Sequence, residues 1–324
     1  MGYFCAFVTF ETMGAWSDPG YLGKKMLDVI SIGALNIDLI AKVNRFPVAD
    51  EEVAVQGLEI FHGGSAANVA VGISRLGHSS GFVGMVGSDQ FGNMLIEDLK
   101  KEGVDVSHLI QTGGNSGLVF AAINPAGERI LYSSSGVSSE FDRSLISVDY
   151  IKKARFLHLT SIIGEKAIAA LEFASGVAYD NNIKVILDPG SILAEEGSEA
   201  LSGILVNCYL IMPSQIEANM LTGLQGEDAG RRLLEYGPKA VIITRGAEGC
   251  LLITKDLTRE VPALRSKAVD TTGAGDSFAA GLISALLVNK GLEEATEFAT
   301  LVASISVTRR GARTTPGKED IRGY

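Results

Sequence analysis

The chain has 324 residues, of which 46% are hydrophobic, so it can bury a sizeable core in one or two domains. Its formal net charge is −10 and its Lys and Arg residues are scattered, which argues against a nucleic-acid-binding surface. No apolar run reaches the roughly 18 residues that cross a bilayer, so no membrane association is predicted.

The three cysteines, Cys5, Cys208 and Cys250, have no pair spacing and predict neither a zinc site nor a disulfide framework. Sparse cysteines among hydrophobic neighbours are typical of buried thiols in a reducing compartment, so we predict a cytoplasmic protein. The first residues are apolar but lack the basic region and cleavage site of a signal peptide. We therefore predict an N-terminal extension over residues 1–25 and a folded domain over residues 26–324.

Short apolar runs alternate with helical patterns from residue 27 onward. Buried strands are predicted at 27–33, 81–86, 156–160, 184–188, 209–213 and 240–244, with 250–254 pairing back onto the last of them. Helices are predicted at 65–77, 89–102, 164–181, around residue 217, and at 278–287 and 292–309. Strands that alternate with helices indicate an α/β fold with a mostly parallel sheet and helices on both of its faces.

Two stretches, residues 38–62 and 115–136, interrupt this alternation because apolar and polar residues alternate along them. We predict that they form strands of a small separate sheet that covers the strand ends as a lid. The exposed edges of such a sheet would be an aggregation liability. A homodimer formed through the lid is therefore predicted.

A glycine-rich turn at residues 270–277 runs directly into the apolar helix predicted at 278–287. The backbone amides of Gly273, Ala274 and Gly275 are expected to be unpaired at the helix N-terminus, where the helix dipole helps them to bind an anion. The carboxylate of Asp276 beside them would repel a phosphate. Its position is explained if Asp276 takes a proton from a hydroxyl group that attacks a phosphoryl group. The alternative is that Asp276 only caps the helix.

Polar residues also follow the first predicted strand and a glycine pair. Asn36 and Asp38 come after the strand at 27–33, and ligands of open α/β sheets bind at such strand ends. Gly63 and Gly64 would let a ligand approach the backbone closely, with Asn68 facing it from the first turns of a helix. The alternative is that Asn36 and Asp38 cap a turn, and a glycine pair by itself is a weak signal.

Together, the motifs at residues 63–68 and 270–276 resemble the paired signatures of the ribokinase-like carbohydrate kinases, also called the PfkB family. The resemblance extends from about residue 26 to the end of the chain. It implies a three-layer α/β/α sandwich with a small β-sheet lid, and an ATP-dependent enzyme that transfers the γ-phosphoryl group to a hydroxymethyl group of a small sugar. It also implies that Asp276 is the general base, that the amides of residues 273–275 form the anion hole, and that the sugar is bound by Asn36, Asp38, Gly63, Gly64 and Asn68.

The resemblance extends to the nucleotide and to metal ions. Thr244, Gly246 and Gly249 match the family's Thr-x-Gly-x-x-Gly turn, and Ser214 and Glu217 stand where the family has an Asn-x-x-Glu motif. It implies that Glu217 acts on Mg²⁺ indirectly, although a helix-surface glutamate is the alternative. A monovalent-cation site for K⁺, built largely from carbonyl groups, is implied at Asp270, Thr272, Ser306, Arg309, Gly311 and Thr315.

This sequence departs from ribokinases proper at several positions. Ser65 and Ala66 follow the glycine pair where Lys and Gly are usual, and a substrate carboxylate is replaced near Thr160. Ribose specifically is therefore not predicted, and a nucleoside kinase of the same family is the alternative. Phe61, Val119 and Phe120 could contact a base or simply pack within the lid, and His62 could contact the substrate or be structural. A second alternative is a non-catalytic nucleotide-binding regulator, which would lack the base or the anion hole.

Overall fold

The computed structural model describes residues 26–322, so the predicted extension over residues 1–25 lies outside the described residues. Nine strands form the large sheet in the order β13-β12-β11-β10-β9-β8-β1-β4-β5. These strands are β1 (Leu27–Ile32), β4 (Ser80–Gly87), β5 (Asp105–Thr112), β8 (Ala154–Thr160), β9 (Lys184–Asp188), β10 (Cys208–Ile211), β11 (Ala240–Thr244), β12 (Cys250–Thr254) and β13 (Thr258–Val261). All neighbours from β5 to β11 pair in parallel, and β12 and β13 are antiparallel.

The parallel sheet is therefore confirmed, but its two edge strands were not predicted. β5 and β13 lie at the two ends of the strand order and carry few buried residues. An edge strand has only one strand neighbour and is partly exposed, so its sequence lacks the continuous apolar run of a central strand.

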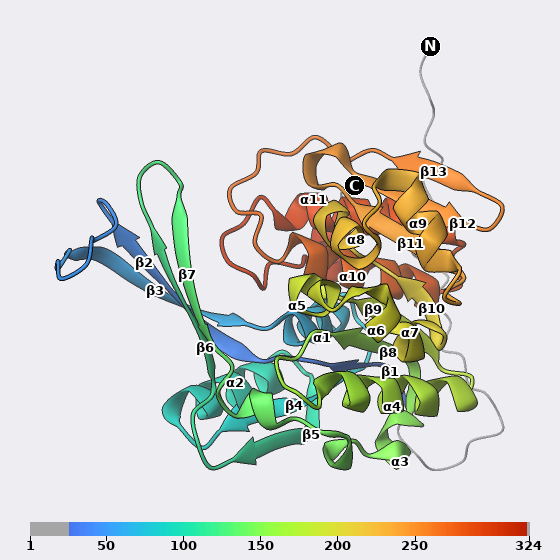
Figure 1. Cartoon of the computed structure of the whole chain (residues 1–324), viewed down its shortest axis with the longest axis horizontal. Helices are drawn as coiled ribbons and strands as arrows, with labels where there is room; N and C mark the ends of the chain where they lie inside the picture. The colour runs from blue at the N-terminus through green and yellow to red at the C-terminus, as the bar shows by residue number, and fades with distance from the viewer. Residues whose placement is uncertain (1–25, 323–324) are drawn as a thin grey trace.

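Helices cover both faces of the large sheet (Figure 1). One face packs against α1 (Ser65–Arg75), α10 (Ala274–Leu287) and α11 (Leu292–Ser306), and α2 (Gln90–Lys101) extends this layer. The other face packs against α4 (Ala167–Asp180), α5 (Gly190–Glu195), α7 (Ser202–Leu205), α8 (Gln215–Thr222) and α9 (Gly226–Leu234). Short helices complete the described chain: α3 (Val148–Ile151), α6 (Gly197–Ala200), α12 (Lys318–Ile321) and the 3₁₀ turns η2 (Gly136–Glu140), η3 (Arg143–Leu145) and η4 (Gly246–Glu248). The three-layer α/β/α sandwich is thus confirmed.

The apolar helix α10 lies in the core, where every residue from Ser277 to Leu287 is buried. Its small residues permit close packing: a Cβ atom on Gly281 would lie 3.0 Å from the Cα atom of Ala299 on α11. α10 also packs against α1, which brings the two helix N-termini together. Among residues 26–322 no helix is both long enough and apolar enough to cross a membrane.

A second, four-stranded sheet projects from the sandwich on the left of Figure 1. It contains β2 (Asn36–Val43), β3 (Val55–Gly63), β6 (Gly117–Ile123) and β7 (Arg129–Ser134) in the order β3-β2-β6-β7, and we call it the small sheet. β2 with β3 and β6 with β7 are antiparallel, whereas β2 with β6 is parallel. β2 begins shortly after β1 ends, and β3 leads directly into α1, so the root of the small sheet lies beside the carboxyl ends of the parallel strands.

Candidate active site

Asp276 is the third residue of α10, and its carboxylate is held by two side chains of α1. Ser65 donates a hydrogen bond from Oγ to Oδ1 of Asp276 at 2.6 Å, and Asn68 donates from Nδ2 to Oδ2 at 2.8 Å. The carboxylate therefore contacts a neighbouring helix, and no side-chain cap of α10 is present. This geometry does not favour a role for Asp276 as a simple helix cap.

The environment of Asp276 sets its acidity in two directions. Burial raises the pKa of the Asp276 carboxyl, and the hydrogen bonds from Ser65 and Asn68 and the charge of Arg313 oppose that rise. The pKa remains above its usual value. A carboxylate of raised pKa is a better proton acceptor than an ordinary surface aspartate.

The turn before α10 depends on glycine. Gly273 has φ 74°, and a Cβ atom there would lie 2.0 Å from the carbonyl oxygen of Ala312, so neither the backbone nor the space permits a side chain. By contrast, a Cβ atom on Gly275 would meet no atom within 4 Å. The expectation of three unpaired amides is wrong for one of them, because the turn closes with a 3.2 Å hydrogen bond from the amide of Ala274 to the carbonyl oxygen of Thr271.

Asn36, Asp38 and Gly63 lie together at the root of the small sheet. Asn36 donates from Nδ2 to Oδ1 of Asp38 at 2.5 Å. A Cβ atom on Gly63 would lie 2.5 Å from Oδ2 of Asp38, and on Gly64, at φ 96°, it would lie 2.3 Å from the carbonyl oxygen of Ala34. The glycine pair is therefore required by the protein's own packing, whether or not a ligand approaches it.

Asp38 also has a raised pKa, for a related reason. Burial raises the pKa of Asp38 to about 6, against the hydrogen bond from Asn36 and the charge of Arg313, and the charge of Asp276 adds to the rise. Because the two carboxylates influence each other, the structure brings the predicted acceptor-side residues close to the predicted base.

The strand register of the small sheet shows which of Phe61, Val119 and Phe120 could contact the nucleobase of a nucleoside. Asp38 pairs with Phe61 on β3 and with Val119 on β6. Directly paired residues point to the same face of a sheet, whereas neighbours along a strand alternate. Phe61 and Val119 thus share the face of Asp38, and Phe120 points to the opposite face.

His62 pairs with Asp98 on α2, with Nδ1 of His62 3.0 Å from Oδ1 of Asp98.

A cleft of about 440 Å³ lies between α8 and the turn from β11 to β12. Of the predicted nucleotide residues, Ser214, Thr244 and Gly246 line it, and Ser214 and Thr244 form an isolated β-bridge. Gly246 has φ 56°, and a Cβ atom there would meet no atom within 4 Å. Gly249 instead shapes the turn, since a Cβ atom there would lie 2.0 Å from the carbonyl oxygen of Val261. The cleft is open, and the lack of a side chain at Gly246 leaves room there for a ligand to approach the turn.

Glu217 forms a capping box at the start of α8. Its Oε2 accepts from the amide of Ser214 at 2.7 Å, and Oγ of Ser214 accepts from the amide of Glu217 at 3.3 Å. One carboxylate oxygen is thereby engaged within the protein, and the other has no hydrogen bond in the described chain. Glu217 can reach a metal ion only with part of its carboxylate, which suits an indirect contact.

Asp188 is a candidate residue that the sequence analysis missed. It ends β9 and pairs with Thr160 at the end of β8. Burial raises its pKa well above the usual value, and the charges of Glu217 and Asp276 raise it further. Asp188 is therefore within electrostatic range of both Asp276 and Glu217. An aspartate at the carboxyl end of a buried strand was the available signal, because such ends carry the ligand sites of α/β sheets.

The residues of the predicted cation site lie in two stretches, 270–272 and 306–315, and several of their side chains already contact other protein groups. Asp270 accepts from the amides of Thr272 at 2.9 Å and Gly311 at 3.0 Å. Oγ1 of Thr315 lies 2.9 Å from Oγ of Ser277, Oγ of Ser306 donates to the carbonyl oxygen of Ala303 at 2.8 Å, and Arg309 pairs with Asp320 at 3.0 Å. Within residues 26–322 no group of three or more His, Cys, Asp and Glu residues could hold a metal ion. Carbonyl groups are therefore the ligands that this segment offers.

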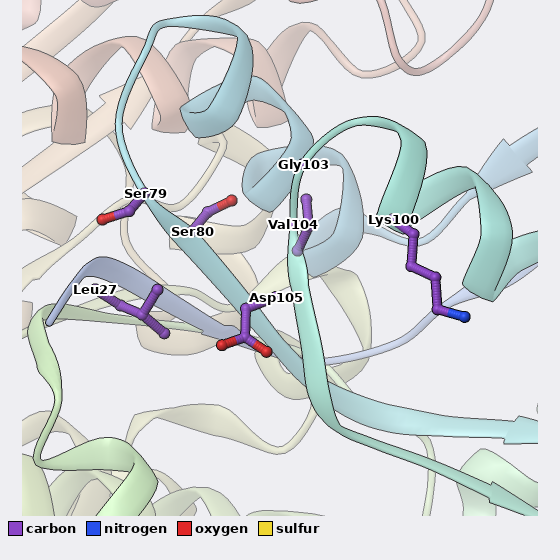
Figure 2. A pocket seen from close by; sticks show the side chains of 7 residues that line it. All are labelled: Leu27, Ser79, Ser80, Lys100, Gly103, Val104 and Asp105. Atoms are coloured by element: carbon purple, nitrogen blue, oxygen red, sulfur yellow. The ribbon is translucent and has the colours of Figure 1, made fainter. Parts of the chain in front are cut away.

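A different hollow of about 410 Å³ lies at the amino ends of β1, β4 and β5 (Figure 2). It is bordered by Leu27, Ser79, Ser80, Lys100, Gly103, Val104 and Asp105. Ligands of parallel sheets bind at the carboxyl ends of the strands. This hollow is at the opposite edge of the sheet from Asp276 and is not part of the candidate site.

Comparison with known proteins agrees with the fold. The model of the pfkB family carbohydrate kinases matches residues 26–319. The chain belongs to this family, whose members are phosphotransferases with an alcohol group as acceptor. The predicted ribokinase-like carbohydrate kinase is thereby confirmed as a class, and a non-catalytic regulator is not favoured.

The similar proteins include kinases named for two different sugars. Ribokinase of Haemophilus influenzae is 30% identical over 299 residues, which are 90% of this chain and 94% of that protein. Fructokinase-1 of Oryza sativa subsp. japonica is 31% identical over 306 residues, which are 88% of this chain and 93% of that protein. The crystal structure of a Thermotoga maritima ribokinase superposes with a TM-score of 0.82 at 29% identity, covering 92% of this chain and 98% of that one.

Proposed function

We propose that this protein is an ATP-dependent kinase that transfers the γ-phosphoryl group to a hydroxymethyl group of a small sugar. One observation carries the proposal: the carboxylate of Asp276 is held by Ser65 and Asn68 next to the unobstructed position at Gly275. A fixed proton acceptor beside helix N-terminal amides is what phosphoryl transfer to a hydroxyl group needs.

Each part of the site then has a task. Asp276 accepts the proton of the attacking hydroxyl group, while Asn36, Asp38 and Asn68 orient the sugar through hydrogen bonds. The amides of Gly273 and Gly275 stabilise the charge on the transferring group, and the amide of Ala274 joins them if its long bond to Thr271 breaks. The cleft with Ser214, Thr244 and Gly246 holds the nucleotide, and Gly249 shapes its turn. Mg²⁺, when bound, neutralises phosphate charge, with Glu217 acting on it through water.

A nucleoside is the second candidate acceptor. Phe61 and Val119 share the face of Asp38, so a base attached to the sugar could lie against apolar side chains there. A bare sugar has no apolar group of that size to place there.

An ADP-release assay against a panel of pentoses, hexoses, sugar acids and nucleosides tests the function. We expect turnover with one of these classes, and D276A should lower kcat by at least about 10²- to 10⁴-fold while ATP still binds. Full activity of D276A would contradict the mechanism, and turnover of nucleosides alone would favour the second candidate.

The predicted K⁺ site and homodimer also remain proposals. For K⁺, activity in KCl should exceed activity in NaCl.

For the dimer, the face of the small sheet that points away from Asp38 carries four exposed apolar side chains, Leu58, Ile60, Ile130 and Tyr132. Leu58 is 58% exposed and Tyr132 is 65% exposed. Such an apolar face is typical of a protein interface. A monomeric mass in light scattering would rule the dimer out.

A further inference from the structure

Arg313, in the segment between α11 and α12, is charged yet only 8% of its side chain is exposed. Its Nε donates to Oδ1 of Asn68 at 2.9 Å, and one terminal nitrogen donates to the carbonyl oxygen of Gly63 at 3.2 Å. The other terminal nitrogen pairs with Asp98 of α2. Burying a guanidinium is costly unless its donors are used. Here all three nitrogens are used, and two of their partners belong to the motif at residues 63–68.

The bond from Arg313 determines which way the amide of Asn68 points. An asparagine amide has one acceptor atom and one donor group, whereas arginine has donors only. Because Nε of Arg313 faces Asn68, the oxygen of Asn68 must point to Arg313, and its nitrogen is left to donate to Asp276. Without Arg313 the amide oxygen of Asn68 loses its donor, and only the bond to Asp276 still orients the amide.

The charge of Arg313 acts on both acidic side chains of the acceptor site. It lowers the pKa of Asp276 and of Asp38, against the burial that raises both. The other charged or titratable groups that face this arrangement are Asp98 on α2, Glu102 directly after α2, Arg75 on α1, His62 on β3 and Asp188 on β9. Asp98 joins Arg313 to His62, because it accepts from both.

We infer that Arg313 is a positioning residue for phosphoryl transfer: it fixes the amide of Asn68 so that its nitrogen holds Asp276, and its charge allows Asp38 and Asp276 to occupy one site. The inference rests on the proposed function in that Asp276 is taken as the base. The backbone of Arg313 is itself held, since Arg75 donates to its carbonyl oxygen at 2.6 Å.

The test compares R313Q with R313K and with R322Q, a control at a side chain that is 65% exposed in the same C-terminal stretch. In R313Q, kcat should fall about 10- to 100-fold because the base is misplaced. The acid limb of its pH–rate profile should move to higher pH, because the lost positive charge raises the pKa of Asp276. R313K keeps the charge but not the planar fork, so kcat should fall while the acid limb stays near its wild-type position. R322Q should leave both unchanged.

D98N should shift the acid limb of the pH–rate profile in the opposite direction to R313Q. It removes the negative charge beside Arg313, so the positive charge acts more strongly on Asp276 and the acid limb should move to lower pH. A general loosening of the fold would not shift R313Q and D98N in opposite directions. Unchanged kcat and an unchanged acid limb in R313Q, or shifts of R313Q and D98N in the same direction, would overturn the inference. If R313Q does not fold, as judged by circular dichroism, R313K and D98N decide the inference. An unchanged kcat in R313K, or an acid limb in D98N that does not move to lower pH, would then overturn it.

A second readout does not depend on turnover. In protein labelled with ¹³C-aspartate, without ATP, the carboxyl signal of Asp276 can be assigned by its absence in D276N and titrated. It should titrate at higher pH in R313Q and at lower pH in D98N than in the wild type. If the wild type phosphorylates nothing in the panel but these shifts are seen, the proposed function fails and the action of Arg313 on Asp276 stands. If turnover is seen without the shifts, only the inference about Arg313 fails.

Discussion

The candidate site has an acceptor half, around Asp38 and Asp276, and a nucleotide half, at the cleft beside α8, and the two halves differ in structure. In the acceptor half, side chains hold one another: Asn36 with Asp38, Ser65 and Asn68 with Asp276, and Arg313 with Asn68. In the nucleotide half, residues of α8 and of the β11–β12 turn border an open cleft, and Gly246 has no neighbour within 4 Å of where a Cβ atom would lie.

The difference follows from what each half has to recognise. An acceptor hydroxyl group must be placed and deprotonated, which requires oriented oxygen and nitrogen atoms of particular side chains. A phosphate chain can be bound by backbone amides, which every residue but proline offers, provided that no side chain blocks them. Changes of side-chain chemistry should therefore affect the acceptor half, and added side-chain atoms should affect the nucleotide half.

Apart from the loss of Asp276 itself, the largest effect is expected where the halves meet, at the start of α10. G275A adds a methyl group where no protein atom lies within 4 Å, so stability should change little. The methyl group should obstruct the transferring phosphoryl group and lower kcat by about 10²- to 10³-fold, as loss of one anion-hole donor does. G273A is the contrasting variant, because its methyl group would lie 2.0 Å from the carbonyl oxygen of Ala312 and should also lower the melting temperature. Wild-type kcat in G275A would place the phosphoryl group elsewhere.

In the acceptor half, the buried carboxyl group of Asp38 should make the free energy of unfolding depend on pH. Since the pKa of Asp38 is raised to about 6 in the folded protein from 3.8, the folded state keeps its proton over a pH range in which the unfolded state has lost it. Asp38 therefore destabilises the fold progressively between about pH 4 and 6 and fully above pH 6. D38N should stabilise the protein by at most about 3 kcal/mol at pH 8 and by little at pH 4, measured by urea unfolding. It should also abolish sugar binding, and equal effects at both pH values would contradict the assignment.

In the nucleotide half the matched pair is G246A and G197A. Both glycines have positive φ, 56° and 80°, and neither has an atom within 4 Å of the added methyl group. Each alanine should cost about 1 kcal/mol of stability for the left-handed backbone. G246A alone should also raise the KM for ATP several-fold, because Gly246 lines the cleft and Gly197 does not. Similar KM values in the two variants would remove Gly246 from the nucleotide site.

The two halves were also unequally accessible to prediction from the sequence. The central strands and α10 could be predicted, because apolar runs and glycine-rich turns are local features. That residues 63–68 and Asp276 belong to one site followed from the family resemblance. The partners that hold the acceptor half could not. Asp98, Asp188 and Arg313 lie on three separate elements, and their approach depends on how α2, β9 and the C-terminal segment pack. Phe120 was grouped with Phe61 and Val119 because the register that separates them comes from pairing between distant strands.

The smallest effect is expected at Glu217, where one carboxylate serves two purposes. The capping box needs an acceptor at this position, and glutamine supplies one, so E217Q should change the free energy of unfolding by less than about 0.5 kcal/mol. S214A removes the hydroxyl acceptor and should cost about 1 kcal/mol. If Glu217 also acts on Mg²⁺ through water, E217Q should raise the Mg²⁺ concentration for half-maximal activity several-fold, whereas S214A should not. An unchanged Mg²⁺ requirement in E217Q would reduce Glu217 to a helix cap and make Asp188, at the end of β9, the next acidic residue to test, because the charges of Glu217 and Asp276 both act on it.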